Sequence, residues 1–172
     1  MSAKSLVTLL LIFIGHAVFA QSKKGTVRPP FTLSLRINDS IAFDQPFKET
    51  FYLVDEGVLQ LFPGDDVLVE VDLEKDSLIN FKIVPTIMNK EKTMRFTFFQ
   101  SYEGNIHKEM ILKVYNPFSK NLVYKAHISI INTDGWKSTS IAPVLPKLLS
   151  YELWPDIIGS ILLQGFKLES AK

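Results

Sequence analysis

Apolar and polar residues alternate along most of this chain with a period of two, which is the spacing of a strand that has one buried face. The clearest segment is 31–38, where every odd position is apolar and every even position is polar. Similar alternation recurs in segments 67–73, 78–84, 93–100, 110–115 and 124–130. No segment sustains the 3.6-residue period of an amphipathic helix. The pattern therefore predicts an all-β fold.

Turn-forming residues separate these strands. The Asp-Glu-Gly sequence at 55–57 predicts a hairpin with Gly57 at positive φ, and Pro-Gly at 63–64 fits a type II turn. The Asn-Thr-Asp-Gly sequence at 132–135 predicts a second hairpin, with 136–141 as its returning strand. Together these signals predict about 8–10 short strands, spaced about eight to twelve residues apart as in an antiparallel β-sandwich of the immunoglobulin-like kind.

The alternation also assigns the core. The residues expected to face inward are Leu33, Leu35, Val69, Val71, Ile79, Phe81, Ile83, Phe96, Leu112 and Ile128. Near the end of the chain, Pro143, Pro146 and Pro155 exclude a long helix across 142–154. Segment 157–168 is apolar on both faces and holds two glycines, each of which costs a helix about 1 kcal/mol. We therefore expect a buried terminal strand there.

The first twenty residues differ from the rest. A short basic start is followed by an apolar run at 6–14 and by a segment that ends in Ala20, which is the order of a secretory signal peptide. We expect cleavage after Ala20, no membrane span after cleavage, and a periplasmic or secreted protein. Residues 21–30 are polar and end in two prolines, which predicts a flexible leader. Residues 31–172 then form a single domain.

Composition narrows the chemistry. The chain has no cysteine, which excludes disulfides, cysteine nucleophiles and thiolate metal sites. Its 19 basic residues nearly equal its 18 acidic ones, so no nucleic-acid partner is expected. Gly57, Gly64, Gly104 and Gly135 are isolated turn residues that form no phosphate-binding loop, and no cofactor is expected.

Candidate groups for catalysis are few. His107 has Glu103 and Glu109 nearby in the sequence, but a catalytic zinc needs three placed ligands, so an ordinary loop histidine is expected. Glu152 and Asp156 flank an aromatic residue and are the alternative for a small glycan hydrolase. The acidic residues within 66–76 alternate along one strand, where a solvated face or a charged guard on an edge strand is expected. We therefore expect no catalytic or metal-binding residue.

Outward-facing aromatic residues are the remaining signal. Tyr52, Phe99, Tyr115 and Trp136 fall opposite the predicted core positions or beside a turn. Such side chains can anchor a protein partner or form a platform for sugars, and they can equally pack against a second sheet. They are the candidate binding surface.

Two stretches carry a resemblance. Residues 112–128 read LKVYNPFSKNLVYKAHI, a strand, an Asn-Pro-Phe turn and an outgoing strand, and residues 150–168 contain Tyr-Glu-Leu-Trp-Pro and end in Gly-Phe-Lys-Leu. Both resemble segments of uncharacterised exported proteins of Gram-negative bacteria that have immunoglobulin-like β-sandwich domains. The resemblance implies the fold and brings no catalytic motif.

These observations lead to three hypotheses. The first, which we favour, is a non-catalytic interaction module that binds another envelope or extracellular protein through a sheet face or a sheet edge. The second is a carbohydrate-binding module that holds a polysaccharide. The third is a small glycan hydrolase that uses either Glu152 and Asp156 or His107.

Overall fold

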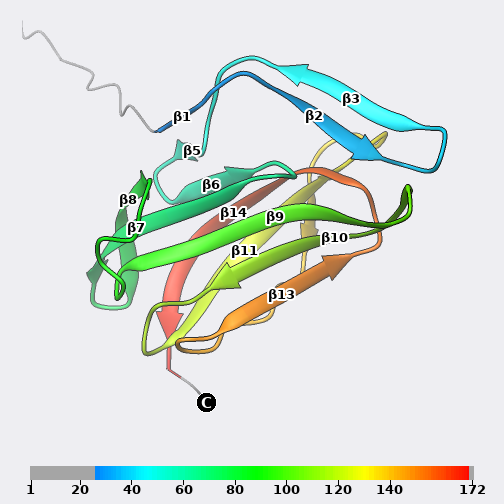
Figure 1. Ribbon diagram of the computed structural model, residues 1–172. Coiled ribbons are helices and arrows are strands. Elements are labelled where there is room, and N and C mark those ends of the chain that lie inside the picture. The colour runs from blue at the N-terminus through cyan, green and yellow to red at the C-terminus, as the bar shows by residue number, and fades with distance from the viewer. Residues whose placement is uncertain (1–25, 171–172) are drawn as a thin grey trace, which may run out of the picture.

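A computed structural model describes residues 26–170, and the expected signal peptide lies outside this range. No helix occurs within it, and every strand pairing is antiparallel. The all-β prediction is therefore confirmed (Figure 1). The fourteen strands of the described part are β1 (Val27–Arg28), β2 (Phe31–Arg36), β3 (Ala42–Phe47), β4 (Thr50–Phe51), β5 (Leu53–Asp55), β6 (Val58–Leu61), β7 (Asp66–Glu74), β8 (Ser77–Val84), β9 (Thr93–Glu103), β10 (Ile106–Tyr115), β11 (Asn121–Ile130), β12 (Lys137–Thr139), β13 (Leu149–Trp154) and β14 (Ile158–Glu169).

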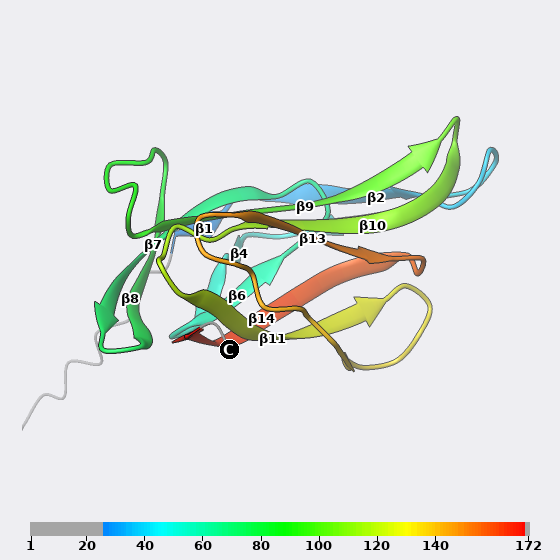
Figure 2. The ribbon, with the colours of Figure 1, turned by 90° about the horizontal axis from the view of Figure 1, so that it is seen from below.

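The long strands lie in two facing layers. Their order is β12-β11-β14-β8-β7-β9-β10-β13, and β6 pairs with both β14 and β5. Figure 2 shows β9, β10 and β13 in one layer and β6, β11 and β14 in the other. Strand β8 joins the layers, because it pairs with β7 along most of its length and with β14 through Ser77 and Lys167. The core fills the space between the layers.

The hairpin of β2 and β3 covers one open side of this core (Figure 1). Its inward residues Leu33 and Leu35 are buried. At the end of β2, the Arg36 amide donates to the Gln100 side chain of β9 at 2.9 Å, and the Gln100 amide donates back to the Arg36 carbonyl at 2.7 Å. The Ile37 carbonyl accepts from the His107 amide at 3.5 Å. The hairpin is therefore held on the layers by its apolar face and by backbone hydrogen bonds at Arg36 and Ile37.

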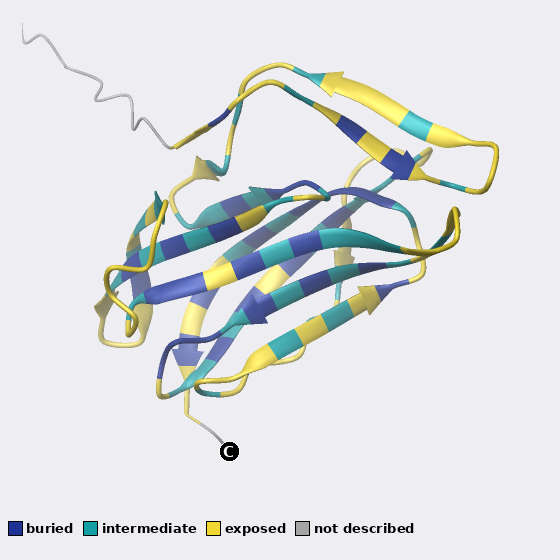
Figure 3. Ribbon diagram, viewed as in Figure 1, coloured by how far each residue is buried: buried dark blue, intermediate teal, exposed yellow. Residues whose placement is uncertain are grey.

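The predicted core is confirmed at most positions. Residues Leu33, Leu35, Val69, Val71, Phe96, Leu112 and Ile128 are all buried, as are Met94, Phe98, Met110 and Val114 (Figure 3). The terminal strand is also confirmed, because residues 158–169 form β14 and most of its apolar side chains are buried. Alternate residues are buried because a strand turns successive side chains to opposite faces.

The assignment of β8 is wrong in part. Leu78 is buried in place of Ile79, whereas Phe81 and Ile83 are half-buried and pack against the core, as predicted. The pairing with β7 shifts between Glu70 and Asp72, and Asn80 in β8 has a φ of 55°. A bulge adds one residue to a strand, so the face that each later side chain takes is reversed.

The strand count also differs from the expected 8–10. The additional strands are mostly short: β1, β4, β5 and β12 have two or three residues each. Such short strands have no room for an alternating pattern. Strand β13 is longer, and it was not foreseen, because two prolines frame it in the sequence.

The expected leader differs at its end, where β1 pairs with β4 and Arg28 is only 4% exposed. The Arg28 guanidinium donates to both carboxylate oxygens of Asp65, at 3.2 and 2.5 Å, and to the Gln60 carbonyl at 3.0 Å. It also lies 4.0 Å from the ring centroid of Tyr52 and 4.8 Å from that of Phe62. A buried cation is tolerated when its donors are used and its charge is paired. This cluster, which we call the Arg28 clamp, therefore fixes the start of the described chain.

The predicted turns are confirmed. Gly57, Gly64 and Gly135 have φ values of 65°, 102° and 73°. The Asp65 amide donates to the Phe62 carbonyl at 3.0 Å, which closes the turn around Gly64. The hairpin around Gly135 joins β11 to β12, which pair through residues 126–128 and 137–139.

Gly135→Val is expected to lower the free energy of unfolding by about 1–3 kcal/mol, because a β-branched residue is strained at positive φ. A Cβ at this position would meet no atom within 4 Å, so the loss would come from the backbone alone. Gly135→Asn, which tolerates this conformation better, is the control and should lose less. Urea unfolding measures both, and equal stability of Gly135→Val and the unsubstituted protein would show that the backbone here relaxes freely.

Candidate functional site

The outer face of β9, β10 and β13 carries apolar residues at several paired positions. Because the even residues of β9 and β10 from 94 to 98 and from 110 to 114 are buried, the odd ones point outward. Pairing brings them side by side: Phe99 lies opposite Ile111, and Ile111 lies opposite Leu153. Tyr115 lies opposite Leu149 in the same way. This face is the first part of the candidate site.

Strand β13 forms the edge of this face. Its outward residues Leu149, Tyr151 and Leu153 are 41%, 53% and 52% exposed. Its inward residues are held from the other side, since the Trp154 indole donates to the Thr139 hydroxyl at 3.0 Å and Glu152 accepts from the Ala142 amide at 3.0 Å. The inward contacts fix the strand, and the outward row is left at the surface.

The backbone of β13 has one free side. The strand ends the order of the sheet and pairs only with β10 in the described part of the chain. The Asn116 amide donates to the Leu148 carbonyl at 3.0 Å, so the even residues of β13 point their backbone groups toward β10. The odd residues must then point theirs away from it. Leu149, Tyr151 and Leu153 thus present both apolar side chains and unpaired backbone groups.

The edges formed by β12 and β3 lack this combination. At the opposite end of the order, β12 has three residues and carries Lys137. Strand β3, which pairs only with β2 among the strands of residues 26–170, carries Asp44 and Pro46. Short length, charge and proline are the usual devices that prevent unwanted edge pairing. The charged residue of β13, Glu152, points inward instead.

The predicted binding surface is divided between different places. Phe99 and Tyr115 are half-buried on the outer face beside β13. Tyr52 stacks on Arg28 in the clamp. Trp136, which is 45% exposed, precedes β12 in the other layer. The alternation of Leu, Tyr and Leu at 149–153 is the signal in the sequence that would have added β13 to this surface.

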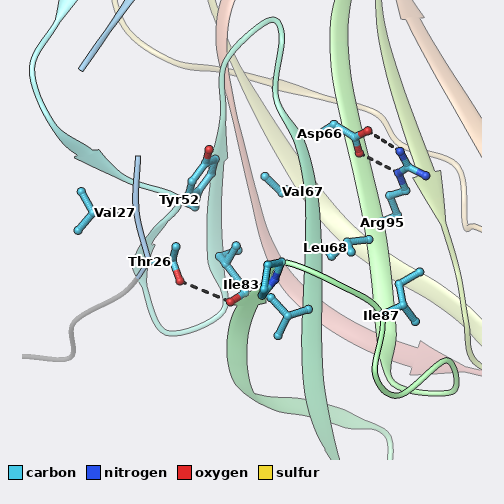
Figure 4. A pocket seen from close by; sticks show the side chains of 11 residues that line it. Thr26, Val27, Tyr52, Asp66, Val67, Leu68, Ile83, Ile87 and Arg95 are labelled. Atoms are coloured by element: carbon cyan, nitrogen blue, oxygen red, sulfur yellow. Dashed lines mark hydrogen bonds and ion pairs between the residues drawn. The ribbon is translucent and has the colours of Figure 1, made fainter. Parts of the chain in front are cut away.

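A groove of about 720 Å³ lies where the start of the described chain meets β7, β8 and β9 (Figure 4). Val27, Ile83 and Ile87 are among its apolar lining residues. At its rim, the Arg95 guanidinium donates to the Asp66 carboxylate at 2.8 and 2.5 Å. This hydrogen bond and the charge of Arg95 hold the pKa of Asp66 below its usual value. A general acid needs a raised carboxyl pKa, so the charge state of Asp66 does not suit acid catalysis.

The candidate catalytic residues are not assembled. His107 lies on β10 and not in a loop, and its two ring nitrogens lie 2.9 Å from the Gln100 side-chain nitrogen and 2.9 Å from the Pro155 carbonyl. Glu152 faces inward, whereas Asp156 is exposed in the bend after β13. In residues 26–170, no three His, Asp or Glu side chains are grouped as metal ligands.

The acidic row within 66–76 is not an edge guard, because β7 lies between β8 and β9. Three of its members, Asp66, Asp72 and Asp76, are paired with cations instead. The Lys92 ammonium donates to Asp72 at 2.9 Å, and this hydrogen bond is the main reason that the pKa of Asp72 is lowered. The Lys120 ammonium binds Asp76 at 2.5 Å. The row is therefore a solvated, ion-paired surface.

Burial raises the pKa of the Tyr124 hydroxyl far above its usual value. This hydroxyl has no hydrogen-bond partner among the described residues, and its ring packs 5.3 Å from that of Phe166. A neutral phenol inside the core can neither reach a ligand nor exchange protons readily. Tyr124 is therefore a core residue.

Comparison with known proteins adds no identification. No protein-family model, no curated protein and no solved structure matches this chain. Within residues 26–170, no helix is long and apolar enough to cross a membrane.

Proposed function

We propose that this protein is an exported, non-catalytic interaction module that binds another protein at the free edge of β13. The observation that carries the proposal is that the same three residues, Leu149, Tyr151 and Leu153, combine exposed apolar side chains with unpaired backbone groups. An added strand would satisfy those backbone groups, and its side chains would cover the apolar row. The partner is an envelope or extracellular protein.

The absence of lysine and proline from β13 supports this proposal. An exposed, apolar edge strand attracts other chains unless something covers it. The edges of β12 and β3 carry a lysine and a proline respectively, and β13 has neither. Tyrosine is enriched at protein interfaces, and Tyr151 lies at the centre of this exposed row, between Leu149 and Leu153.

The candidate catalytic residues do not favour an enzyme. The acids that sequence analysis singled out are separated or already paired, and the ring nitrogens of His107 lie within hydrogen-bond distance of other groups. Acid-base catalysis requires a tuned group in a site that excludes water. Binding without turnover is therefore the function that these groups favour.

Two further expectations belong to this proposal. Export rests on the signal-like first twenty residues. An immunoglobulin-like sandwich is the proposed fold class, which two facing antiparallel layers around one core support. The β2–β3 hairpin would be an addition to that fold, because it forms a separate two-stranded sheet beside the layers.

The test is to place a lysine on the edge. Leu153→Lys is expected to weaken partner binding at least tenfold, on the order of the loss of one central interface residue. Leu153 is exposed, so the fold should be retained, and circular dichroism would verify this. The control is Trp136→Lys, an exposed residue of the other layer. If Trp136→Lys abolishes binding and Leu153→Lys does not, the binding site is elsewhere.

A further inference from the structure

We propose that the protein that pairs with β13 is a second copy of this chain, bound antiparallel about a twofold axis through Tyr151. This inference rests on the proposed function, because it uses the same edge. It specifies the partner, the register and the symmetry of the complex. A twofold interface requires a surface that is complementary to itself.

The side chains of β13 meet that requirement. Its outward row reads Leu149, Tyr151, Leu153, which is the same in both directions. In an antiparallel pair centred on Tyr151, each Leu149 lies opposite the copy's Leu153, and the two tyrosines lie opposite each other. Side chains directly opposite in an antiparallel pair share a face and contact each other. The exposed row of one copy would therefore be covered by the same row of the other.

The backbone of β13 is also complementary to itself. The odd residues of β13 point their backbone groups away from β10, and the proposed register pairs odd residues with odd residues. These positions become hydrogen-bonded pairs of the antiparallel ladder. The same three residues in each copy thus gain both backbone and side-chain partners.

Charge selects this register over its neighbours. Glu152 is the charged residue of β13. A shift that centres the axis on Glu152 places two carboxylates directly opposite each other, which is destabilising. A shift toward Ser150 leaves Leu153 beyond the paired region. The Tyr151-centred register places Glu152 opposite the copy's Ser150 and pairs all three apolar residues.

The neighbouring strand fits the same arrangement. The Lys113 ammonium lies 5.9 Å from the Tyr151 ring centroid, so it can hold that ring over the sheet. Lys113 and its counterpart would be three strand spacings apart, about 14 Å. That separation exceeds the screening length of about 8 Å at physiological salt. The two lysines therefore do not oppose the pairing.

Single cysteines test the register, because the chain has none of its own. Tyr151→Cys should form an intermolecular disulfide, since paired positions of this kind lie about 5.5 Å apart between Cα atoms. Leu149→Cys alone should not, because the two copies of residue 149 are offset by four residues, about 13 Å. Leu153→Cys alone should not form an intermolecular disulfide either, because the two copies of residue 153 are offset by the same distance. Mixing Leu149→Cys with Leu153→Cys should restore cross-linking.

The readouts are non-reducing electrophoresis under mild oxidation and sedimentation velocity of the unsubstituted exported chain. We expect Tyr151→Cys and the mixed pair to cross-link at least tenfold faster than either Leu149→Cys or Leu153→Cys alone. We also expect a dimer that Leu153→Lys dissociates and Trp136→Lys leaves intact. Cross-linking that is equal for all variants would overturn the proposal.

A monomer at all concentrations with no preferential cross-linking at 151 would also overturn it. The proposed function then stands or fails separately. The proposed function stands if the monomer binds a different envelope protein and the Leu153→Lys variant no longer binds that protein. It fails if that binding is unaffected by substitution on β13.

Discussion

Arg28→Ala is expected to lower the free energy of unfolding by about 3–5 kcal/mol, because it leaves the Asp65 carboxylate without its cation in a buried place. The side chains of Arg28 and Asp65 are only 5% and 11% exposed. Asp65 also accepts a hydrogen bond from the Phe62 amide at 2.8 Å, so it cannot move into solvent without opening a turn. The measurement is urea unfolding followed by tryptophan fluorescence.

An exposed ion pair of the same type provides the control. Arg95 binds Asp66 with two hydrogen bonds, but the two side chains are 54% and 42% exposed. Surface pairs contribute about 0–1 kcal/mol, so Arg95→Ala should cost much less than Arg28→Ala. Similar losses for the two variants would mean that the Arg28 clamp is not a stable part of the fold.

The second large effect is expected at Phe96. Phe96→Ala should lower the free energy of unfolding by about 3–5 kcal/mol, because it leaves a cavity in a packed core. Phe96 is fully buried, and its ring lies 5.9 Å from that of Phe166 on the facing layer. Phe99→Ala is the matched control, since it removes the same side chain from the outward face of the same strand.

Phe99 is half-buried, so Phe99→Ala should lower the free energy of unfolding clearly less than Phe96→Ala. The comparison tests which face of β9 is inward, because a register error of one residue would exchange the two results. A larger loss for Phe99→Ala than for Phe96→Ala would contradict the layer arrangement.

Alternation predicted the long strands because a half-buried strand must place every second side chain in the core. It was therefore reliable for β9 and β10, whose inward residues are buried. It failed only at the start of β8, because the bulge at Asn80 reverses the faces and Leu78 is buried there in place of Ile79. One extra residue in a strand leaves no mark in the hydrophobic pattern.

The Arg28 clamp could not be predicted in this way. Arg28 lies in a polar segment before two prolines, which has the composition of a flexible leader. Its carboxylate partner, Asp65, is 37 residues away in a turn. Only the folded chain brings the two together, so composition indicated flexibility where tertiary contacts give order.

The candidate site was found in part. Phe99 and Tyr115 were identified correctly as outward residues of one face, because their neighbours alternate clearly. Strand β13 was interpreted instead as an aromatic and acidic cluster around Trp154. The structure places Tyr151 and Trp154 on opposite faces of that strand, with Tyr151 exposed and Trp154 buried. Whether an edge is free depends on sheet order, which the sequence of one strand does not contain.

The most direct test of the β13 edge is amide hydrogen exchange measured residue by residue. The exchange rates of the monomer are compared with those of the complex, which is prepared first at protein concentrations where the chain associates. Ser150 and Glu152 point toward β10, so their amides should be protected with or without a partner. The amides of Tyr151 and Leu153 should exchange rapidly in the monomer and become at least tenfold slower when a strand adds to the edge. If these two amides still exchange rapidly while a complex is formed, β13 is not where the partner binds.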